Sequence, residues 1–149
     1  MNDSTNDTRE HIRKVRDRIF DVIENLTIRG QRHDASKLEE PEKSGYGHLQ
    51  TRLASIVYGT DEYRAALAEA KDTIAHHYAH NSHHPEHYEN GVAGMSLLDV
   101  LEMLCDWKAA SERTKQGSIQ QSLPINRERF GISNQLYSIL ENTVRELGW

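Results

Sequence analysis

Apolar side chains recur every three or four residues through most of this 149-residue chain, and this spacing limits the fold more than any other feature. Between residues 8 and 27 the repeat is carried by Ile12, Val15, Ile19, Val22, Ile23 and Leu26. A period near 3.6 residues places such side chains on one face of an α-helix. Similar stripes follow later, and no segment has the convincing alternation of a β-strand. The sequence therefore predicts an all-α fold.

Capping residues, glycines and prolines divide the chain into about six predicted helices. These cover residues 8–27, 34–40, 48–58, 60–81, 96–114 and 133–147, and residues 43–47 and 116–127 are predicted to be loops. Gly30 is expected to stop the first helix, and Ser96 and Asp99 have the spacing of a capping box. Residues 1–7 are polar and are expected to be disordered. The length predicts a single-domain helical bundle over residues 1–149.

Composition narrows the possible partners and the compartment. The net charge of −5 argues against an extended nucleic-acid surface. A single cysteine, Cys105, agrees with a reducing compartment. The sequence contains no run of 18 apolar residues, so it does not predict a membrane span. We therefore expect a cytoplasmic protein without a membrane segment. The apolar last helix, which ends at Trp149, could dock on a second subunit, so a homo-oligomer stays open.

Histidine is the outlier of the composition, with nine residues in all. Six of them fall within twelve residues: His76, His77, His80, His83, His84 and His87. Elsewhere, the adjacent pair His33-Asp34 puts an imidazole nitrogen beside a carboxylate oxygen, which suits a divalent first-row metal. His11 lies on the flank of the first apolar stripe, and Asp106 lies between apolar neighbours. Together these four residues are candidate ligands from separate helices.

The order His11, His33-Asp34 and Asp106 resembles the motif of the HD-domain superfamily of metal-dependent phosphohydrolases. Lys37 matches a lysine that often follows the His-Asp pair in that superfamily, and residues 8–115 contain the whole motif. The resemblance implies an HD-domain-like helical fold and a site for one or two divalent ions (Mn, Fe, Co, Ni, Zn or Mg). It also implies hydrolysis of a small phosphorylated substrate, with a nucleotide as first choice.

Some members of that superfamily bind a second ion through extra histidines, and residues 83–91 are similar to that region. The resemblance thus makes His77 or His80, together with His84, candidate ligands. Asp34 is expected to bind the metal and to help orient the attacking water. Lys37 is expected to neutralise a phosphoryl oxygen, and Glu86 is a candidate acid or base.

Each assignment has an ordinary alternative. The His-Asp pair is also compatible with a capped helix start, and Asp106 could form a salt bridge. His11, Lys37 and the histidine tract could simply be exposed to solvent. Two other functions also fit the same residues. One is a di-iron oxygenase built on the same scaffold, and the other is a non-catalytic metal-binding or interaction module.

Overall fold

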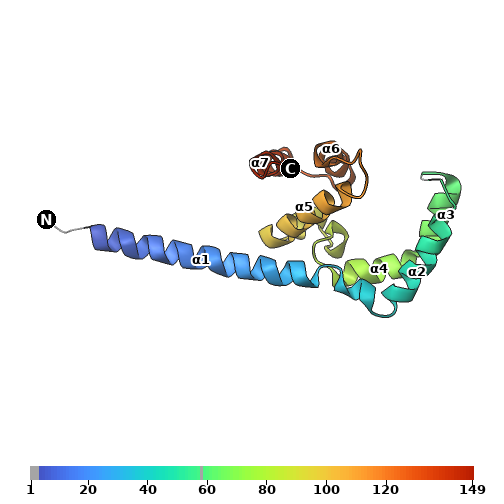
Figure 1. Ribbon diagram of the computed structural model, residues 1–149, viewed down its shortest axis with the longest axis horizontal. Helices are drawn as coiled ribbons and strands as arrows, with labels where there is room; N and C mark the ends of the chain where they lie inside the picture. The colour runs from blue at the N-terminus through green and yellow to red at the C-terminus, as the bar shows by residue number, and fades with distance from the viewer. Residues whose placement is uncertain (1–3, 58) are drawn as a thin grey trace. The chain divides into compact units, whose positions relative to one another are not determined.

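The computed structural model describes residues 4–57 and 59–149. These residues form seven α-helices and three short 3₁₀-helices, with no strand among them (Figure 1). The prediction of an all-α fold is confirmed. The chain divides into two compact units, residues 1–33 and 34–149, and each is described by itself. That both belong to one domain stays a prediction.

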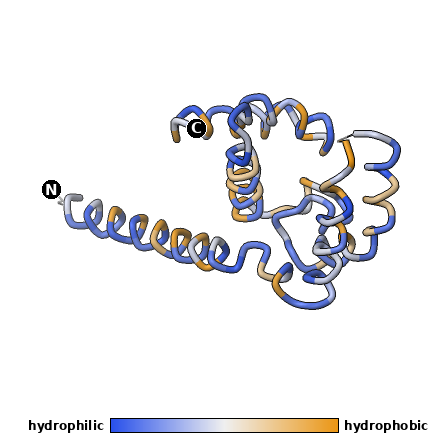
Figure 2. Tube along the Cα trace, turned by 45° about the vertical axis from the view of Figure 1, so that its right-hand side comes forward, coloured by the Kyte–Doolittle hydropathy of each residue, from blue (hydrophilic) through white to orange (hydrophobic). Residues whose placement is uncertain are grey.

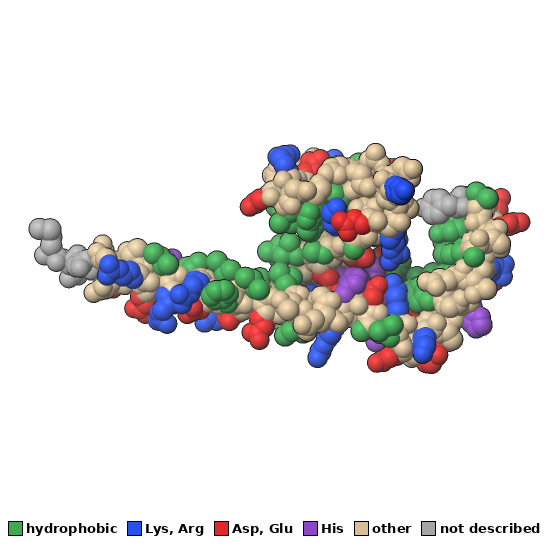
Figure 3. Space-filling model, in the orientation of Figure 1, with side chains coloured by type: hydrophobic (Ala, Val, Ile, Leu, Met, Phe, Trp, Pro, Cys, Tyr) green, Lys and Arg blue, Asp and Glu red, His purple; other side chains and the backbone are tan. Residues whose placement is uncertain are grey.

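The first unit is a single helix, α1 (Thr5–Arg32). The helix passes through Gly30, so the predicted stop there is wrong. Residues 5–7 are helical, and the disorder predicted for them is also wrong; residues 1–3 lie outside the described residues. The apolar stripe runs along α1 as predicted, visible as alternating orange segments in Figure 2 and green atoms in Figure 3, and none of its residues is buried.

Among the described residues, no helix combines the length and the apolar character needed to cross a bilayer.

The second unit contains the other helices. In chain order they are η1 (Ala35–Leu38), α2 (Glu42–Leu53), α3 (Asp61–Glu69), α4 (Lys71–His80), η2 (Pro85–His87), η3 (Gly91–Gly94), α5 (Leu97–Ser111), α6 (Ile119–Phe130) and α7 (Asn134–Glu146). Helix α2 packs against η1, α3 and α4, whereas α6 packs against α5 and α7 (Figure 1). The 3₁₀-helices η2 and η3 belong to the connection between α4 and α5.

Three helix starts in this unit follow the sequence signals. Thr60 and Ser133 each accept a hydrogen bond from the backbone N–H three residues later. Ser96 and Asp99 form the predicted capping box at the start of α5. Each such cap stabilises its helix by about 1 kcal/mol. The positions of these starts were therefore predictable from local sequence.

Other boundaries were predicted wrongly. The expected loop at 43–47 is the beginning of α2, and the expected helix at 60–81 is divided at Ala70 into α3 and α4. The segment 116–127 is not a loop, because α6 runs through it with Pro124 inside the helix. Pro124 removes one backbone hydrogen bond. Burial of Ile119 and Leu123 on one face offsets that loss.

The apolar core lies mainly among the last three helices. Its buried members are Val100, Met103, Leu104, Ile119, Leu123, Ile132, Leu140 and Val144. Truncating Leu104, which is 1% exposed, to alanine would cost about 2–5 kcal/mol. This core fixes α5, the helix that carries Glu102 and Asp106.

Helices α2 and α4 approach each other closely at Gly45. A Cβ atom at this position would lie 2.1 Å from Thr73 Oγ1 and 2.9 Å from Thr73 Cβ. Contacts this short are not possible between real atoms, and the β-branched threonine has little freedom to move away. The absence of a side chain at Gly45 therefore lets α2 lie against α4.

Candidate metal centre

Asp34 is the first residue of the second unit and has an unusual backbone conformation. Its φ of 56° and ψ of 16° place it in the left-handed region, which aspartate tolerates better than most residues. The Lys37 Nζ atom donates to Asp34 Oδ2 over 2.6 Å. The other carboxylate oxygen, Oδ1, faces the histidines of the second unit.

Three histidines converge at Asp34 Oδ1. His77 Nε2 lies 3.2 Å from this oxygen, and His83 Nε2 lies 3.5 Å from it. His84 Nε2 is 2.9 Å from His77 Nε2. One ligand atom from each of the four residues lies within 4.8 Å of all the others. We call Asp34, His77, His83 and His84 the Asp34 group.

The spacing within the Asp34 group fits a bound transition metal. With metal–ligand distances of about 2.1 Å, adjacent ligand atoms lie about 3.0 Å apart in octahedral geometry and about 3.4 Å apart in tetrahedral geometry. Three of the separations in this group, His77–His84, His77–Asp34 and His83–Asp34, are 2.9, 3.2 and 3.5 Å, and all of its ligand atoms lie within 4.8 Å of one another. Three imidazoles and one carboxylate are a donor set for Zn, Fe, Co, Ni or Mn, and a poorer one for Mg, which prefers oxygen.

Two carboxylates orient the buried histidines from behind. Glu42 Oε2 lies 2.8 Å from His77 Nδ1, and Glu102 Oε1 lies 3.2 Å from His83 Nδ1. A carboxylate at Nδ1 favours a proton on that nitrogen, so Nε2 is left to bind a metal. His77 and His83 are 1% and 2% exposed, which fixes their rings. Both therefore present the metal-binding nitrogen toward Asp34.

Glu42 is ionised despite having no solvent exposure. Burial by itself raises the pKa of its carboxyl group, but hydrogen bonds from His76, His77 and Ser36 outweigh burial and hold the pKa below its usual value. Ser36 Oγ also accepts a hydrogen bond from the buried amide of Asn81. This network joins η1, α2 and α4 behind the metal-binding nitrogens.

His84 differs from the two buried histidines in being half-buried. Burial, with a smaller contribution from neighbouring His77, lowers the pKa of His84 to about 4. Its ring is therefore neutral at pH 7, which is the form that binds a metal. The nearby carboxylates of Asp106 and Asp34 oppose this shift without cancelling it.

The loop that carries His83 and His84 is tied to α5 through Asp99. Its carboxylate accepts hydrogen bonds from Ser82 Oγ, Tyr88 Oη, Ser96 Oγ and the Ser96 backbone N–H, at 2.6–2.9 Å. Burial raises the pKa of Asp99, but these bonds outweigh it and hold the pKa well below the usual range. Asp99 thus fixes both ends of the loop that supplies two ligands.

A second set of candidate ligands consists of Glu42, His76 and His80, which we call the Glu42 group. Glu42 Oε1 lies 2.8 Å from His76 Nδ1, and the rings of His76 and His80 stack at 4.0 Å. His80 is exposed, and its Nδ1 contacts the carbonyl oxygen of His76 over 2.8 Å. Predicted ligand His80 therefore does not belong to the Asp34 group.

Among the other predicted residues, Asp106 lies beside the Asp34 group, with a carboxylate oxygen within 4.8 Å of a His83 ring nitrogen. Lys37 contacts Asp34 directly, and its predicted role toward phosphate stays a prediction. Glu86 accepts a hydrogen bond from Arg129 over 3.0 Å. Its predicted role as an acid or base stays a prediction.

The predicted ligands His11 and His33 both belong to the first unit. Helix α1 is continuous from His11 to its last residue, directly before His33. At 1.5 Å per residue, this length of helix separates the two by about 33 Å. One ion cannot bind both side chains of one chain, so this pairing is wrong. His33 directly precedes Asp34, and its role as a ligand stays a prediction.

The sequence did not single out His83, Glu42 or Glu102. His83 was visible in the histidine tract, but its selection depends on a turn after Asn81 that no local pattern specifies. Glu102 lies on α5, and an acidic residue on a helix is too common to mark a site. Glu42 lies 35 positions before the histidine that it orients, so no spacing rule relates them.

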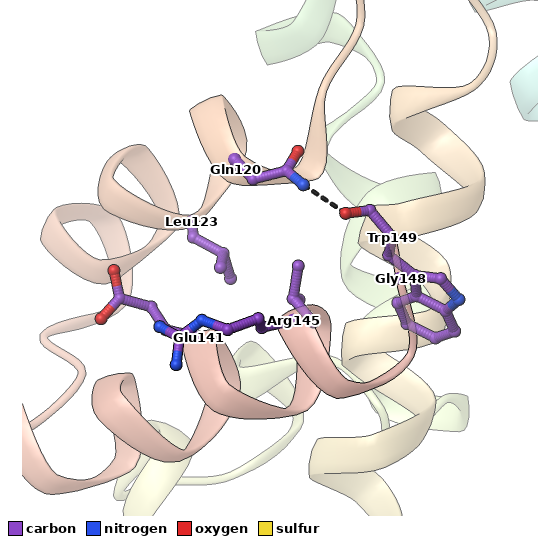
Figure 4. Close-up of a pocket in the computed structure, with 7 residues that line it drawn as sticks. Gln120, Leu123, Glu141, Arg145, Gly148 and Trp149 are labelled. Carbon is purple, nitrogen blue, oxygen red and sulfur yellow. Dashed lines mark hydrogen bonds between the residues drawn. The ribbon is translucent and has the colours of Figure 1, made fainter.

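Two pockets of the second unit differ in whether residues of the Asp34 group line them. A pocket of about 420 Å³ between α6 and α7 is lined by Gln120, Leu123, Glu141, Val144, Arg145, Gly148 and Trp149 (Figure 4). It shares no residue with the Asp34 group. A pocket of about 350 Å³ between α5 and α6 does share one, His84, and Asp106 also lines it.

Comparison with protein-family models gave a match over residues 1–146 to a family described as a family of unknown function, DUF5662. Comparison with curated protein sequences and with solved structures gave no match.

Proposed function

Because this chain belongs to the DUF5662 family, whose function is unknown, we propose a function from the site itself: metal-dependent hydrolysis of a small phosphoester. One observation carries the proposal. Ligand atoms of His77, His83, His84 and Asp34 lie within 4.8 Å of one another, and three of their separations, 2.9, 3.2 and 3.5 Å, are close to those of metal ligands. The predicted resemblance to HD-domain phosphohydrolases supports the same reaction class, with a nucleotide as the first substrate to test.

The residues of the chain have separable tasks in this proposal. A divalent ion held by the Asp34 group would activate water and polarise a phosphoryl oxygen. Glu42 and Glu102 keep the proton on Nδ1 of their histidines. Lys37 fixes Asp34 through Oδ2, and its ammonium group places positive charge beside the site for a phosphate. Asp106 lines the same pocket as His84 and remains a further candidate ligand beside the Asp34 group.

The experiment is a hydrolysis assay of nucleoside monophosphates and p-nitrophenyl phosphate, each with Mn, Co, Ni, Zn and Mg. We expect activity with at least one transition metal and loss of at least about 100-fold in His83→Gln. His80→Gln is the matched control, because His80 is exposed and outside the Asp34 group. Circular dichroism should confirm that both variants fold.

Three results would contradict the proposal. One is equal activity of His83→Gln and the unsubstituted protein, and another is metal content that does not depend on His83. The third is bound iron with an oxygen-dependent absorption band and no hydrolysis, which would favour the di-iron oxygenase instead.

A further inference from the structure

The pocket between α5 and α6 adjoins the Asp34 group but has a different lining. Its volume of about 350 Å³ is in the range of small-ligand sites. His84 and Asp106 line it, so a ligand in the pocket would lie next to the Asp34 group. The remaining lining supplies aromatic rings, an amide and a cation. These side chains are not metal ligands, and they have no role in the hydrolysis step proposed above.

Aromatic side chains give the pocket flat apolar surfaces. The rings of Trp107 and Phe130 lie nearly parallel, with an interplanar angle of 6° and centroids 5.9 Å apart. The guanidinium of Arg129 lies 4.6 Å from the centroid of the Phe130 ring. Tyr78 adds a further ring from α4. Such surfaces favour a planar ring, which gains by stacking on aromatic and guanidinium faces.

Asn126 gives the pocket a group that can recognise the edge of a ring. Its side chain is half-buried on α6, and among the described residues it has no hydrogen-bond partner. An amide offers a donor and an acceptor side by side. Heterocyclic bases present the complementary pair on one edge, whereas a sugar or an alkyl group does not present it in a plane.

Arg129 supplies positive charge in the same pocket. It pairs with Glu86 over 3.0 Å and also has a hydrogen bond with the Tyr78 side chain, and a guanidinium has five N–H groups, so others can reach further acceptors. A phosphoryl group placed between the Asp34 group and Arg129 would be contacted on one side by the ion proposed for that group and on the other by the guanidinium. The volume suits one monoester better than a polymer.

We propose that this pocket binds the heterocyclic ring of a nucleoside monophosphate, with the ring against Trp107 and Phe130, its edge at Asn126 and its phosphate toward His84 and Arg129. This inference rests on the proposed function and names the substrate class of the same site. It adds a binding subsite that recognises the organic part of the substrate rather than the phosphate.

Calorimetric titration with AMP and with ribose 5-phosphate tests the proposal. AMP carries an adenine base at the ribose carbon where ribose 5-phosphate has a hydroxyl group. We expect AMP to bind at least about tenfold more tightly. Asn126→Ala should reduce this preference to about threefold or less, whereas Arg129→Ala should weaken both probes by a similar factor. Arg127→Ala is the matched control, since Arg127 lies on the same helix and contacts Asn134 and Tyr137 instead.

Titrations in EDTA and in Mn separate this proposal from the proposed function. Preference for AMP in EDTA supports the pocket even if no metal-dependent hydrolysis is found. Equal affinity for the two probes, an unchanged preference in Asn126→Ala, or no AMP binding in either condition overturns it. Equal loss in Arg127→Ala and Asn126→Ala also overturns it, because the effect would then not be local to the pocket.

Discussion

The Asp34 group and the Glu42 group contain the same kinds of side chain and differ in how these are held. In the Asp34 group the ligands come from three segments of the chain, and each of its two buried histidines has a carboxylate behind its Nδ1. In the Glu42 group both histidines come from one turn of α4. His80 uses its Nδ1 on the backbone of its own helix and remains exposed.

The difference shows that histidine content alone does not build a metal site. A pair of histidines four residues apart forms as soon as its helix forms, because the contact is local. The Asp34 group forms only when η1, α4, the following loop and α5 have packed together. The packing of these segments fixes the orientation of the imidazole rings, and a metal centre requires such fixed ligands. Substitutions in and around the two groups can therefore distinguish them.

The largest effect is expected from Asp34→Asn. Asparagine tolerates the left-handed backbone of this position, so the substitution removes the charge without adding backbone strain. We expect metal content, measured by mass spectrometry after dialysis against trace metal, to fall at least about 100-fold, more than the loss expected for a residue that only orients a ligand. Unchanged metal content would show that the four-residue convergence is not a metal site.

Glu102→Gln should have an intermediate effect. The amide can still contact His83 Nδ1, but it no longer favours a proton there through charge, so metal affinity should fall by about 10–100-fold. Competition with a chromogenic chelator measures this change. Glu112→Gln, directly after the last residue of the same helix, is the control, because Glu112 is exposed and pairs with Lys108. If both variants bind metal equally well, the carboxylates behind the histidines have no orienting role.

Asp99→Asn tests the attachment of the loop that supplies two ligands to the Asp34 group and none to the Glu42 group. Loss of charge-assisted hydrogen bonds should lower the free energy of unfolding by about 1–3 kcal/mol at pH 7, as measured in urea. The pKa of Asp99 is depressed in the folded state, so its stabilisation is present above pH ~4 and is lost as pH falls below that value.

The difference in stability between this variant and the unsubstituted protein should therefore narrow as pH is lowered from 5 to 3. A difference that is constant over this range would mean that the charge of Asp99 does not contribute to the stability of the loop.

The smallest effect is expected from His80→Ala. His80 is exposed and its ring stacks on His76, so metal affinity and activity should change by less than about twofold. The same chelator competition and hydrolysis assays measure it. A loss as large as that in Asp34→Asn would show that the Glu42 group, not the Asp34 group, holds the ion.

The sequence predicted those parts of the molecule that depend on neighbours along the chain. Helical stripes, the capping box at Ser96 and the helix starts at residues 60 and 133 are local, and they were placed correctly. Helix α6 was missed because Pro124 suggested a turn, and only tertiary burial of Ile119 and Leu123 offsets the proline. Propensity is a weak guide where packing decides.

The same division applies to the site. Asp34 and His84 were chosen from composition and motif, and the structure places both in the Asp34 group. His77 was one of two choices for a single position, and ring orientation by Glu42 distinguishes it from His80. His83 could not be distinguished from its neighbours, because the turn that buries it forms through contacts with α5.

The close approach of α2 and α4 at Gly45 limits how this sequence can vary. Even one methyl group there would collide with Thr73 and force the two helices apart. Glu42 lies one turn before this glycine and contacts two histidines of α4 over 2.8 Å. These hydrogen bonds would be lost if the two helices moved apart. A sequence that keeps the carboxylate and both histidines but gains a side chain at position 45 would retain every predicted ligand and still lose the site.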